Sequence, residues 1–313
     1  MILYNNMKIP DFSGDIHADV LMSRYTTWHV GGPAECIVEP KTITDITSVF
    51  NYANNKGIPI TIIGYGSNIL VSDSGIPGIT VCMKRYFRKA EIDTESGLIT
   101  AEAGCSLPSL AHLAELNGIS GFEFLVGIPG TVGGGMVMNA GIGGCEGPSI
   151  RDVLVCATLL DCVTGEICVK RGSALDMRYR HTCISSEKLW ALKGEFKSEK
   201  RDLLENIRMR HKEIIATRKA KQPHGTWNAG SVFRRPEGEF GAGWYIEQAG
   251  LKGFRIGGAI VSPKHANWII NEGTATAEDI IRLINHTSET VRQKFGVTLD
   301  REVHIIPEPD CRQ

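Results

Sequence analysis

Residues 121–141, GFEFLVGIPGTVGGGMVMNAG, constrain this chain more than any other stretch. Its glycines include positions 127, 130, 133, 134 and 135, and glycine admits positive φ and lets another molecule approach the main chain closely. Successive N–H groups in such a loop form a concavity that suits phosphate. Glycine, Thr131 and Asn139 supply no base or nucleophile of their own. The stretch therefore predicts a cradle for a phosphate-bearing cofactor, although its composition alone fits a structural loop between strands equally well.

The composition is that of an ordinary globular protein. The 313 residues allow two or three domains, and a net charge of −1 favours neither nucleic acid nor an anionic membrane as a partner. No apolar run is long enough to span a bilayer, and the N-terminal residues lack a secretory pattern, so we expect a cytoplasmic protein. The nine cysteines include no C-x-x-C pair, which predicts reduced, buried thiols at Cys36, Cys82 and Cys156 and no metal site.

A strand–helix–strand unit precedes a second glycine loop. Residues 34–40 and 58–63 read as strands, and residues 42–55 carry apolar side chains at helical spacing. The unit leads into Gly64-Tyr65-Gly66-Ser67-Asn68, a position where α/β folds commonly place ligand loops. The G-x-G-x-x-G pattern is absent, so the sequence does not support a dinucleotide-binding Rossmann site.

The rest of the chain reads as many short strands and a few helices, which predicts an α+β protein. Residues 106–117 and 276–295 are expected helices, and residues 199–221 form a long polar helix whose charges predict a solvated link between domains. The expected strands are residues 69–72, 78–83, 98–103, 153–160, 166–170, 190–196, 268–271 and 301–306.

Several motifs occur together in one order. They are YTTWHVGGP (25–33), GYGSNILVSD (64–73), GIPGTVGGGMVMNAG (127–141) and NAGSVFRRP (228–236), followed by residues 250–258 and His265-Ala266. In these motifs the chain resembles the UDP-N-acetylenolpyruvoylglucosamine reductase family of FAD enzymes, from about residue 25 to residue 306. No long insertion follows Arg180, which is similar to the shorter form of the family.

The resemblance implies a vanillyl-alcohol-oxidase-like α+β fold, with two FAD-binding subdomains and a C-terminal α+β domain for the UDP-sugar. The implied boundaries are residues 1–85 with 302–313, residues 86–205, and residues 206–301. Non-covalent FAD would lie along Gly64, Tyr65, Gly66, Ser67, Asn68, Ile69, Leu70, Gly127, Ile128, Pro129, Gly130, Thr131, Gly133, Gly134, Asn139, Ala140 and Gly141.

The resemblance also implies the chemistry. NADPH would reduce the flavin, and UDP-N-acetylglucosamine enolpyruvate would then be reduced to UDP-N-acetylmuramate. Ser231 would be the proton donor, with Arg180 and Glu302 at the enolpyruvyl group; taken singly, these residues look like a turn serine and two surface charges. Candidates for contacts to the diphosphate and carboxylate are Lys221, Asn228, Lys252 and His265.

Some positions depart from the family pattern. Trp28 and His29 stand where Phe and then Arg or Lys are more usual, Arg234 replaces a frequent Lys, and Trp268 replaces a smaller or phenylalanine side chain. His29 raises the alternative of a covalently attached flavin, but its surrounding motif favours non-covalent binding. We expect a monomer.

Two other functions remain open at this point. One is a flavin oxidoreductase of the same fold acting on an alcohol or phenol, which would lack the Ser231, Arg180 and Glu302 set. The other is a flavin- or UDP-sugar-binding sensor without turnover, which would lose the serine or the glutamate. Both residues are present, which weighs against the sensor.

Overall fold

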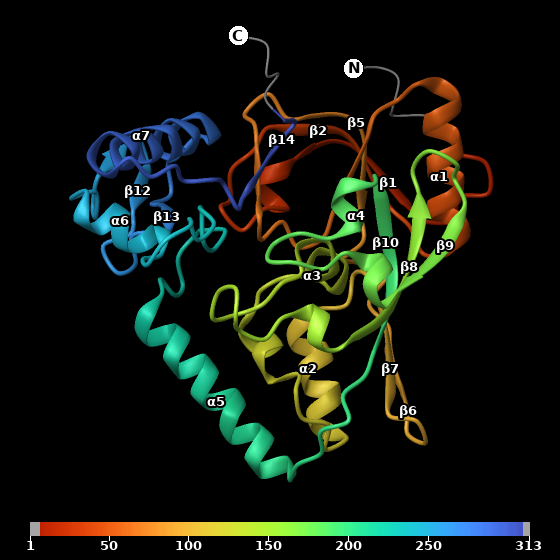
Figure 1. The fold of residues 1–313 in the computed structure, drawn as a ribbon. Helices are drawn as coiled ribbons and strands as arrows, with labels where there is room; N and C mark the ends of the chain where they lie inside the picture. Colours follow the sequence, from red (N-terminus) through yellow and green to blue (C-terminus); the bar gives the residue numbers. More distant parts are fainter. Residues whose placement is uncertain (1–6, 309–313) are drawn as a thin grey trace. The chain divides into compact units, whose positions relative to one another are not determined.

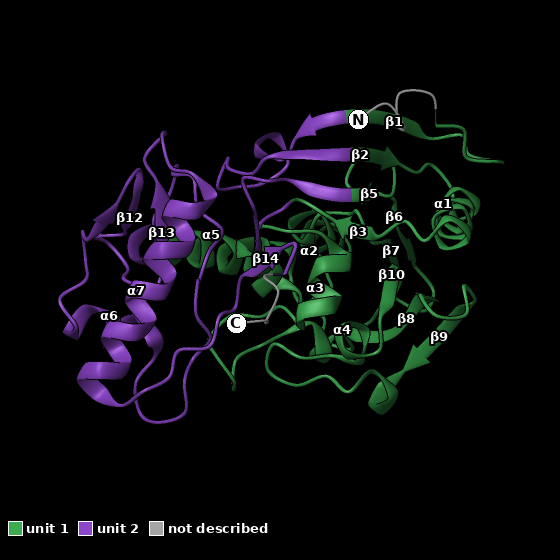
Figure 2. Ribbon diagram, turned by 90° about the horizontal axis from the view of Figure 1, so that it is seen from above, with its two compact units in different colours: residues 1–18, 36–65, 78–218 green, residues 19–35, 66–77, 219–313 purple. Residues whose placement is uncertain are grey.

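The computed structural model describes residues 7–308 and divides into two compact units (Figures 1 and 2). Unit 1 comprises residues 1–18, 36–65 and 78–218, and unit 2 comprises residues 19–35, 66–77 and 219–313. The chain therefore enters unit 2 twice before its long C-terminal segment. This division has two units, and the three-domain boundaries expected from the sequence remain a prediction.

A four-stranded sheet carries the N-terminal region, in the order β1 (Asp15–Leu21), β2 (Pro33–Glu39), β5 (Ile76–Cys82) and β3 (Ile60–Ile63). β3 and β5 are parallel. The helix α1 (Ile43–Lys56) connects β2 to β3, as the sequence predicts, and buries Ile46, Val49, Phe50 and Ala53. β1, β2 and β5 each have residues in both units.

A five-stranded antiparallel sheet forms the second half of unit 1. Its order is β6 (Ala90–Asp93), β7 (Leu98–Glu102), β10 (Leu189–Phe196), β8 (Leu154–Asp161) and β9 (Ile167–Arg171). The helices around it are α2 (Leu107–Leu116), α3 (Val132–Met138) and α4 (Cys183–Ser186). Short 3-10 turns occupy Met22–Arg24, Glu123–Gly127, Ile150–Asp152 and Gly172–Leu175.

The long helix α5 (Leu204–Lys221) carries the chain from unit 1 into unit 2. Unit 2 then holds α6 (Ala242–Gln248), a three-stranded antiparallel sheet of β11 (Arg255–Ile256), β12 (Ala259–Val261) and β13 (Ile269–Asn271), and α7 (Ala277–Phe295). The last strand, β14 (His304–Ile306), pairs in parallel with β4 (Ile69–Val71).

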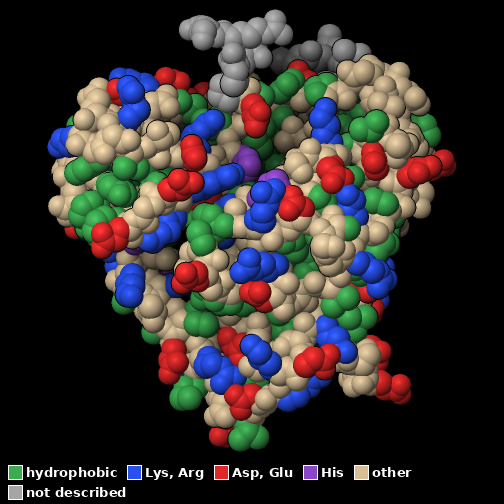
Figure 3. All heavy atoms as spheres, in the orientation of Figure 1, with side chains coloured by type: hydrophobic (Ala, Val, Ile, Leu, Met, Phe, Trp, Pro, Cys, Tyr) green, Lys and Arg blue, Asp and Glu red, His purple; other side chains and the backbone are tan. Residues whose placement is uncertain are grey.

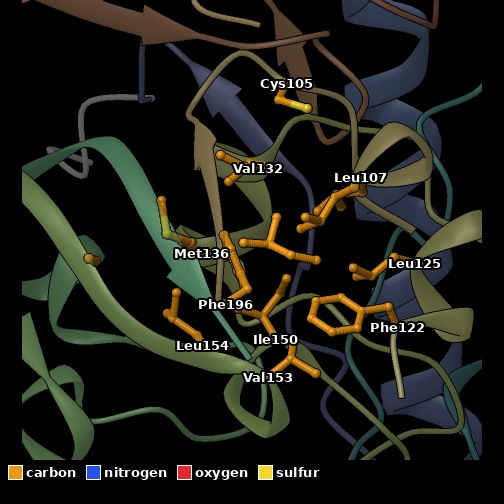
Figure 4. Packing of buried hydrophobic residues seen from close by; sticks show 14 of the residues in the cluster. Cys105, Leu107, Phe122, Leu125, Val132, Met136, Ile150, Val153, Leu154 and Phe196 are labelled. Atoms are coloured by element: carbon orange, nitrogen blue, oxygen red, sulfur yellow. The ribbon is translucent and has the colours of Figure 1, made fainter. Parts of the chain in front are cut away.

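The buried apolar side chains form two clusters in unit 1 and one in unit 2. In the larger cluster of unit 1, Val132 and Met136 of α3 pack with Leu107, Ile150 and Phe196 (Figure 4). The other cluster of unit 1 lies between α1 and the four-stranded sheet. In unit 2, Trp28 and Leu70 from the two early segments pack with α6 and α7.

Helix ends follow the capping signals of the sequence. Thr42 with Asp45 and Thr276 with Asp279 form capping boxes at the starts of α1 and α7, and both helices end at a glycine in the left-handed conformation. The Asp73 carboxylate adds a second cap to α7, because it accepts hydrogen bonds from the N–H groups of Ala277 and Glu278 at 2.9 and 3.0 Å.

The structure corrects the expectation that residues 121–141 form a loop throughout. Residues 123–127 make a 3-10 turn and residues 132–138 form α3, which leaves an open loop at residues 128–131 between them. Of the glycines at 127, 130, 133, 134 and 135, Gly130 alone has positive φ, at 155°. The Thr131 hydroxyl caps α3 by accepting from the Gly134 N–H, and the apolar Val132 and Met136 bury one side of the helix. Packing thus overrides the low helix propensity of glycine.

The cysteines in the described residues are free, and Cys36, Cys82 and Cys156 are buried as predicted; Cys311 lies outside these residues. Burial raises the pKa of the Cys36 thiol to about 12, so this thiol stays protonated at neutral pH. Acidic and basic side chains are interspersed on the face shown in Figure 3. A search of residues 7–308 for a bilayer-spanning helix finds none.

Candidate active site

The two glycine loops meet inside unit 1. A Cβ atom added to Gly64 would stand 2.4 Å from the Thr131 hydroxyl oxygen, so only glycine allows this contact. Thr131 is itself buried, and it pairs with Ser106 in an isolated antiparallel bridge. Two segments that are far apart in the sequence, and that both read as phosphate cradles, are therefore neighbours.

The glycines of α3 have two different surroundings. A Cβ atom on Gly133 would lie 2.9 Å from the Ala103 Cβ, and one on Gly135 would lie 2.9 Å from a Leu107 methyl carbon. A Cβ atom on Gly134 would meet only the Thr131 hydroxyl, at 3.6 Å. Gly133 and Gly135 are thus required by packing against the protein, whereas Gly134 faces open space.

Some of the main-chain N–H groups of residues 128–133 already donate hydrogen bonds within the protein. The N–H groups of Val132 and Gly133 donate to the carbonyls of Cys105 and Ala103 at 2.7 and 2.8 Å, and the N–H of Ile128 donates to Leu125. Among residues 7–308, no hydrogen bond is seen from the N–H of Gly130 or Thr131. These two donors, with the open side of Gly134, fit a group that presents phosphate oxygens.

Asn139 anchors the turn that carries Arg180. Its side-chain NH₂ donates to the Arg178 carbonyl at 2.9 Å, and its side-chain oxygen accepts from the Arg151 N–H at 3.0 Å. Asn139 is 2% exposed and ends α3 in the left-handed conformation, with φ of 42°. Its amide is therefore engaged with protein atoms, and it acts here as a positioning residue.

Arg180 is held in an uncommon backbone conformation, with φ of 53°. Reciprocal main-chain bonds between Arg178 and His181 close the turn. The Arg180 guanidinium lies 5.1 Å from the centre of the Tyr179 ring, and one of its nitrogens lies 3.4 Å from the Gly141 carbonyl oxygen. The turn thus presents the arginine next to residues 139–141, another stretch that the sequence assigns to the site.

Ser231 lies in unit 2, in a strand-like segment fixed on both sides. Asn267 accepts from the N–H groups of Val232 and Phe233 through its carbonyl and side-chain oxygens, and its amide NH₂ donates to the Phe233 carbonyl at 2.9 Å. From the other side, the Glu302 N–H donates to the Val232 carbonyl at 2.8 Å. Ser231 and Glu302 are therefore brought close in unit 2, while Arg180 belongs to unit 1.

The glycine loop that begins at Gly64 continues into unit 2, where residues 66–70 are predicted to contact the cofactor. Gly66 has φ of 65°, and a Cβ atom there would stand 2.0 Å from the Tyr25 carbonyl oxygen. The Asn68 side chain donates to the Glu302 carbonyl at 3.1 Å. Ile69 and Leu70 lie in β4, which pairs with β14, and β14 begins two residues after Glu302. The loop and the C-terminal glutamate are thus joined.

Two of the candidate substrate contacts lie near each other. Burial lowers the pKa of His265, and the charge of Lys252 lowers it further, so this imidazole is neutral at pH 7. The Lys252 ammonium lies 2.8 Å from a Glu247 carboxylate oxygen. Asn228 instead makes a local turn with Thr226 and Gly230, and Lys221 is exposed at the end of α5.

Three of the four departures from the family pattern have contacts that the structure shows. Trp28 is fully buried in unit 2, and its ring N–H donates to the Ile269 carbonyl at 2.8 Å. His29 stacks on Trp227 with ring centres 4.7 Å apart. Trp268 is buried and lies against the His265 ring at 4.3 Å. Nothing in the structure explains Arg234, whose buried Nε makes no hydrogen bond to the described residues.

Two family models match the chain. Residues 34–169 match an FAD binding domain, and residues 222–306 match the C-terminal domain of UDP-N-acetylenolpyruvoylglucosamine reductase. The reductase of that name from Desulforamulus reducens is 42% identical over 296 residues, which are 94% of this chain and 95% of that protein. The one from Prochlorococcus marinus is 41% identical over 288 residues, 92% of this chain and 97% of that protein.

The chain belongs to the UDP-N-acetylenolpyruvoylglucosamine reductase family. The crystal structure of the reductase from Thermus caldophilus agrees: it is 30% identical, has a TM-score of 0.77, and covers 95% of this chain and 100% of that chain. The predicted fold class, an α+β FAD-binding fold of the vanillyl-alcohol-oxidase type with a C-terminal α+β domain, is confirmed. The protein is a flavin oxidoreductase of this family.

Sequence reasoning missed residues that hold the reductase motifs in place. Asn267 fixes the Ser231 segment, and Asp73 caps α7, yet neither stands in a pattern that predicts those partners. Asn267 follows His265-Ala266 directly, and that position was its only signal.

Proposed function

We propose that this protein reduces UDP-N-acetylglucosamine enolpyruvate to UDP-N-acetylmuramate in peptidoglycan precursor synthesis, using non-covalent FAD and NADPH. The observation that supports it most is the set of hydrogen bonds that hold the segment following Ser231 in place. The Glu302 N–H and Asn267 hold the residues that follow Ser231, which fixes the main chain at Ser231 next to that at Glu302. Membership of the reductase family supports the same substrate.

Several residues fit a bound FAD. Gly64 packs on Thr131, Gly134 faces open space, and the N–H groups of Gly130 and Thr131 suit pyrophosphate oxygens. Residues 66–70 and 127–141 would hold the cofactor without a covalent bond. When bound there, FAD would supply the hydride-transfer chemistry that links NADPH to the vinyl carbon of the substrate. His29 is engaged in stacking with Trp227, which favours non-covalent attachment.

Side chains of the protein would stabilise the negative charge that develops on the substrate and would supply a proton. Negative charge spreads into the substrate carboxylate as the vinyl group is reduced, and Arg180 would stabilise it, since preorganised charge is commonly the largest catalytic term. Ser231 would donate its hydroxyl proton to the carbon next to the carboxylate. A serine is a weak acid, but an enolate is a strong enough base to accept its proton. Glu302 would act with Arg180 at the same group.

Lys221, Asn228, Lys252 and His265 would contact the diphosphate and the carboxylate. A neutral His265 can donate one hydrogen bond and accept another, while Lys252 supplies a point charge for phosphate. We further propose that the protein acts as a monomer in the cytoplasm, where nucleotide sugars and NADPH are present. No nucleic-acid partner is implied by a net charge of −1.

An anaerobic spectroscopic titration tests the proposal. Purified holoenzyme should show flavin absorbance that bleaches with NADPH and returns on adding UDP-N-acetylglucosamine enolpyruvate, with UDP-N-acetylmuramate identified by mass spectrometry. Acid precipitation should release yellow FAD into the supernatant. A reduced flavin that only oxygen reoxidises would overturn the substrate assignment, and yellow colour retained by the precipitate would overturn non-covalent binding.

A further inference from the structure

A cluster of two histidines and a glutamate lies between α2 and α5 in unit 1. His112 and Glu115 are one helical turn apart on α2, and His211 reaches them from α5. One potential ligand atom from each residue lies within 4.8 Å of the others. None of these residues belongs to the site described above.

His211 is buried without a hydrogen bond. It is 4% exposed, and neither ring nitrogen makes a hydrogen bond to any residue between 7 and 308. Its Nδ1 lies 2.9 Å from a Glu115 oxygen, but the pair lacks the direction of a hydrogen bond. Buried polar atoms normally have a partner, so this ring calls for one.

We propose that His112, Glu115 and His211 bind a divalent transition-metal cation of the zinc type. Two imidazoles and one carboxylate are a donor set that suits Zn²⁺ and leaves a position for water. The Glu115 Oε2 atom lies 3.0 Å from Nδ1 of His112 and 2.9 Å from Nδ1 of His211, so small shifts would bring all three to bonding distance. His112 has 59% of its side chain exposed, which gives the cation a route in.

The charges around the cluster set the ligand states. Burial lowers the pKa of His211, against the opposing charge of Glu115, and a neutral imidazole is the form that binds metal. Burial raises the pKa of Glu115, but hydrogen bonds from Arg208 and His112 outweigh it, so the pKa is lowered and the carboxylate is ionised. Arg208 Nε donates to the other carboxylate oxygen at 2.7 Å, which orients Glu115 as outer-sphere partners do. Its positive charge moderates the affinity.

A second cluster, Asp15, His17 and Glu39, is a weaker candidate. Arg85 lies 3.1 Å from Asp15 and 2.6 Å from Glu39, and Lys41 lies 3.7 Å from Asp15. These acids are already neutralised by cations, whereas the buried His211 nitrogens lack a hydrogen-bond partner.

A cation at the first cluster would fasten α5 to α2. Ile207 and His211 are the buried residues of α5, so the helix has little apolar anchorage. It is also attached by ion pairs, Arg208 with Glu115 and Arg210 with Glu123 and Asp202, and by a hydrogen bond from Arg210 to Ser120. A metal bond to His211 would add a directional link at one of the few buried positions of the helix.

Calorimetric titration of the FAD-loaded protein with ZnCl₂ tests the site, in a Cys145→Ser and Cys311→Ser background that removes one exposed thiol and one C-terminal thiol. We expect one equivalent to bind and to raise the melting temperature. His112→Asn should weaken binding at least about tenfold, since even outer-sphere changes cost 10–100-fold. His112 is exposed, so this variant keeps the fold. His286→Asn, an exposed histidine on α7, is the matched control and should bind like the parent.

Anomalous diffraction at the zinc edge from ZnCl₂-soaked crystals locates the ion independently. A peak between His112, Glu115 and His211 is the expected result. Absence of binding, equal affinity in the parent and His112→Asn, or a peak at the remaining thiols or at Asp15, His17 and Glu39 instead would overturn the proposal. None of these outcomes depends on enzyme turnover.

Discussion

The side-chain amide of Asn68 donates a hydrogen bond to the main-chain carbonyl of Glu302 at 3.1 Å, across a separation of 234 residues. The next contact runs the other way, since the His304 N–H donates to the Asn68 carbonyl at 3.0 Å. One residue of a predicted cofactor loop is thereby fixed to the residue predicted to assist catalysis.

This relation predicts an order among Asn68 variants. Asn68→Ala loses one hydrogen bond and should lower the free energy of unfolding by about 1 kcal/mol. Asn68→Asp should cost more, because it sets a carboxylate oxygen against a carbonyl oxygen. Urea unfolding measures both, with Asn285→Asp on the exposed side of α7 as control. Equal losses in the two variants would mean that the carboxylate meets no repulsion from the carbonyl, and no loss in either would mean that the amide donor is unimportant.

Ser231→Ala should separate the two half-reactions. Flavin bleaching by NADPH should keep its rate, whereas reoxidation by the enolpyruvyl substrate should slow roughly 10²–10⁴-fold, as expected when a positioned general acid is removed. Ser231→Cys retains a donor and should recover part of the rate. Stopped-flow absorbance follows each half. If both halves slow equally, the serine positions the flavin or supports folding instead.

Gly133→Ala and Gly134→Ala form a matched pair within α3. The added methyl of Gly133→Ala would crowd Ala103, so unfolding should become easier by about 1–3 kcal/mol. The methyl of Gly134→Ala meets only Thr131 at 3.6 Å and improves helix propensity, so the apoprotein should be as stable as the parent while FAD binds more weakly. Fluorescence titration of the apoprotein with FAD measures the affinity of each variant. An unchanged affinity in Gly134→Ala would mean that the cofactor does not lie against Gly134.

Asn139→Gly should disturb Arg180 from a distance. Glycine keeps the left-handed conformation but removes the hydrogen bonds to the Arg178 carbonyl and from the Arg151 N–H, at about 0.5–1.5 kcal/mol each. Substrate reoxidation of the flavin should slow more than NADPH bleaching. The control is Asp176→Gly, which removes an exposed ion pair with Arg178 from the same turn and should change little. Matching losses in the two variants would contradict a positioning role for Asn139.

Asp45 should contribute stability that disappears in acid. Burial alone raises the pKa of this carboxyl, but hydrogen bonds from the N–H groups of Ser13, Lys41 and Thr42 outweigh it and hold the pKa below its ordinary value of 3.8. A lowered pKa means that the contribution is present above the ordinary value and is lost as the pH falls through the folded-state value.

Asp45→Asn should therefore unfold more easily than the parent at pH 7, by about 1.5–3 kcal/mol for hydrogen bonds to a charged group. The difference should shrink steadily below about pH 4. Urea unfolding at several pH values measures it, and a difference that stays constant from pH 7 to pH 3 would show that the charge of Asp45 is irrelevant.

Local signals in the sequence predicted much of the secondary structure. The bounds of α1 and α7 lie within one residue of the predicted ranges 42–55 and 276–295, because capping depends on residues within one turn. α3 was missed, since its glycines disfavour a helix until Val132 and Met136 are packed in the core. The strand β1 was missed as well, although Asp15–Val20 alternate polar and apolar residues.

The candidate site residues came from family motifs, and their assigned roles stay predictions. What the sequence could not supply is the use of each polar group. Asn139 stands in a cofactor motif, yet its amide binds Arg178 and Arg151, which are remote in the sequence. The grouping of His112 with His211 likewise depends on how α5 lies against α2, for which no spacing rule exists.

The pairing of β14 with β4 also has a consequence for folding during synthesis on the ribosome. The hydrogen-bond partner of Trp28 is Ile269, 241 residues later in the chain, and the strand partner of Ile69 is His304. At roughly 5–20 residues per second, these early segments leave the ribosome on the order of 10–50 s before their partners. All of unit 1 has been synthesised by residue 218, so its two cores can close while Trp28 and Leu70 are still exposed. Nascent chains should therefore need protection of those segments until synthesis ends.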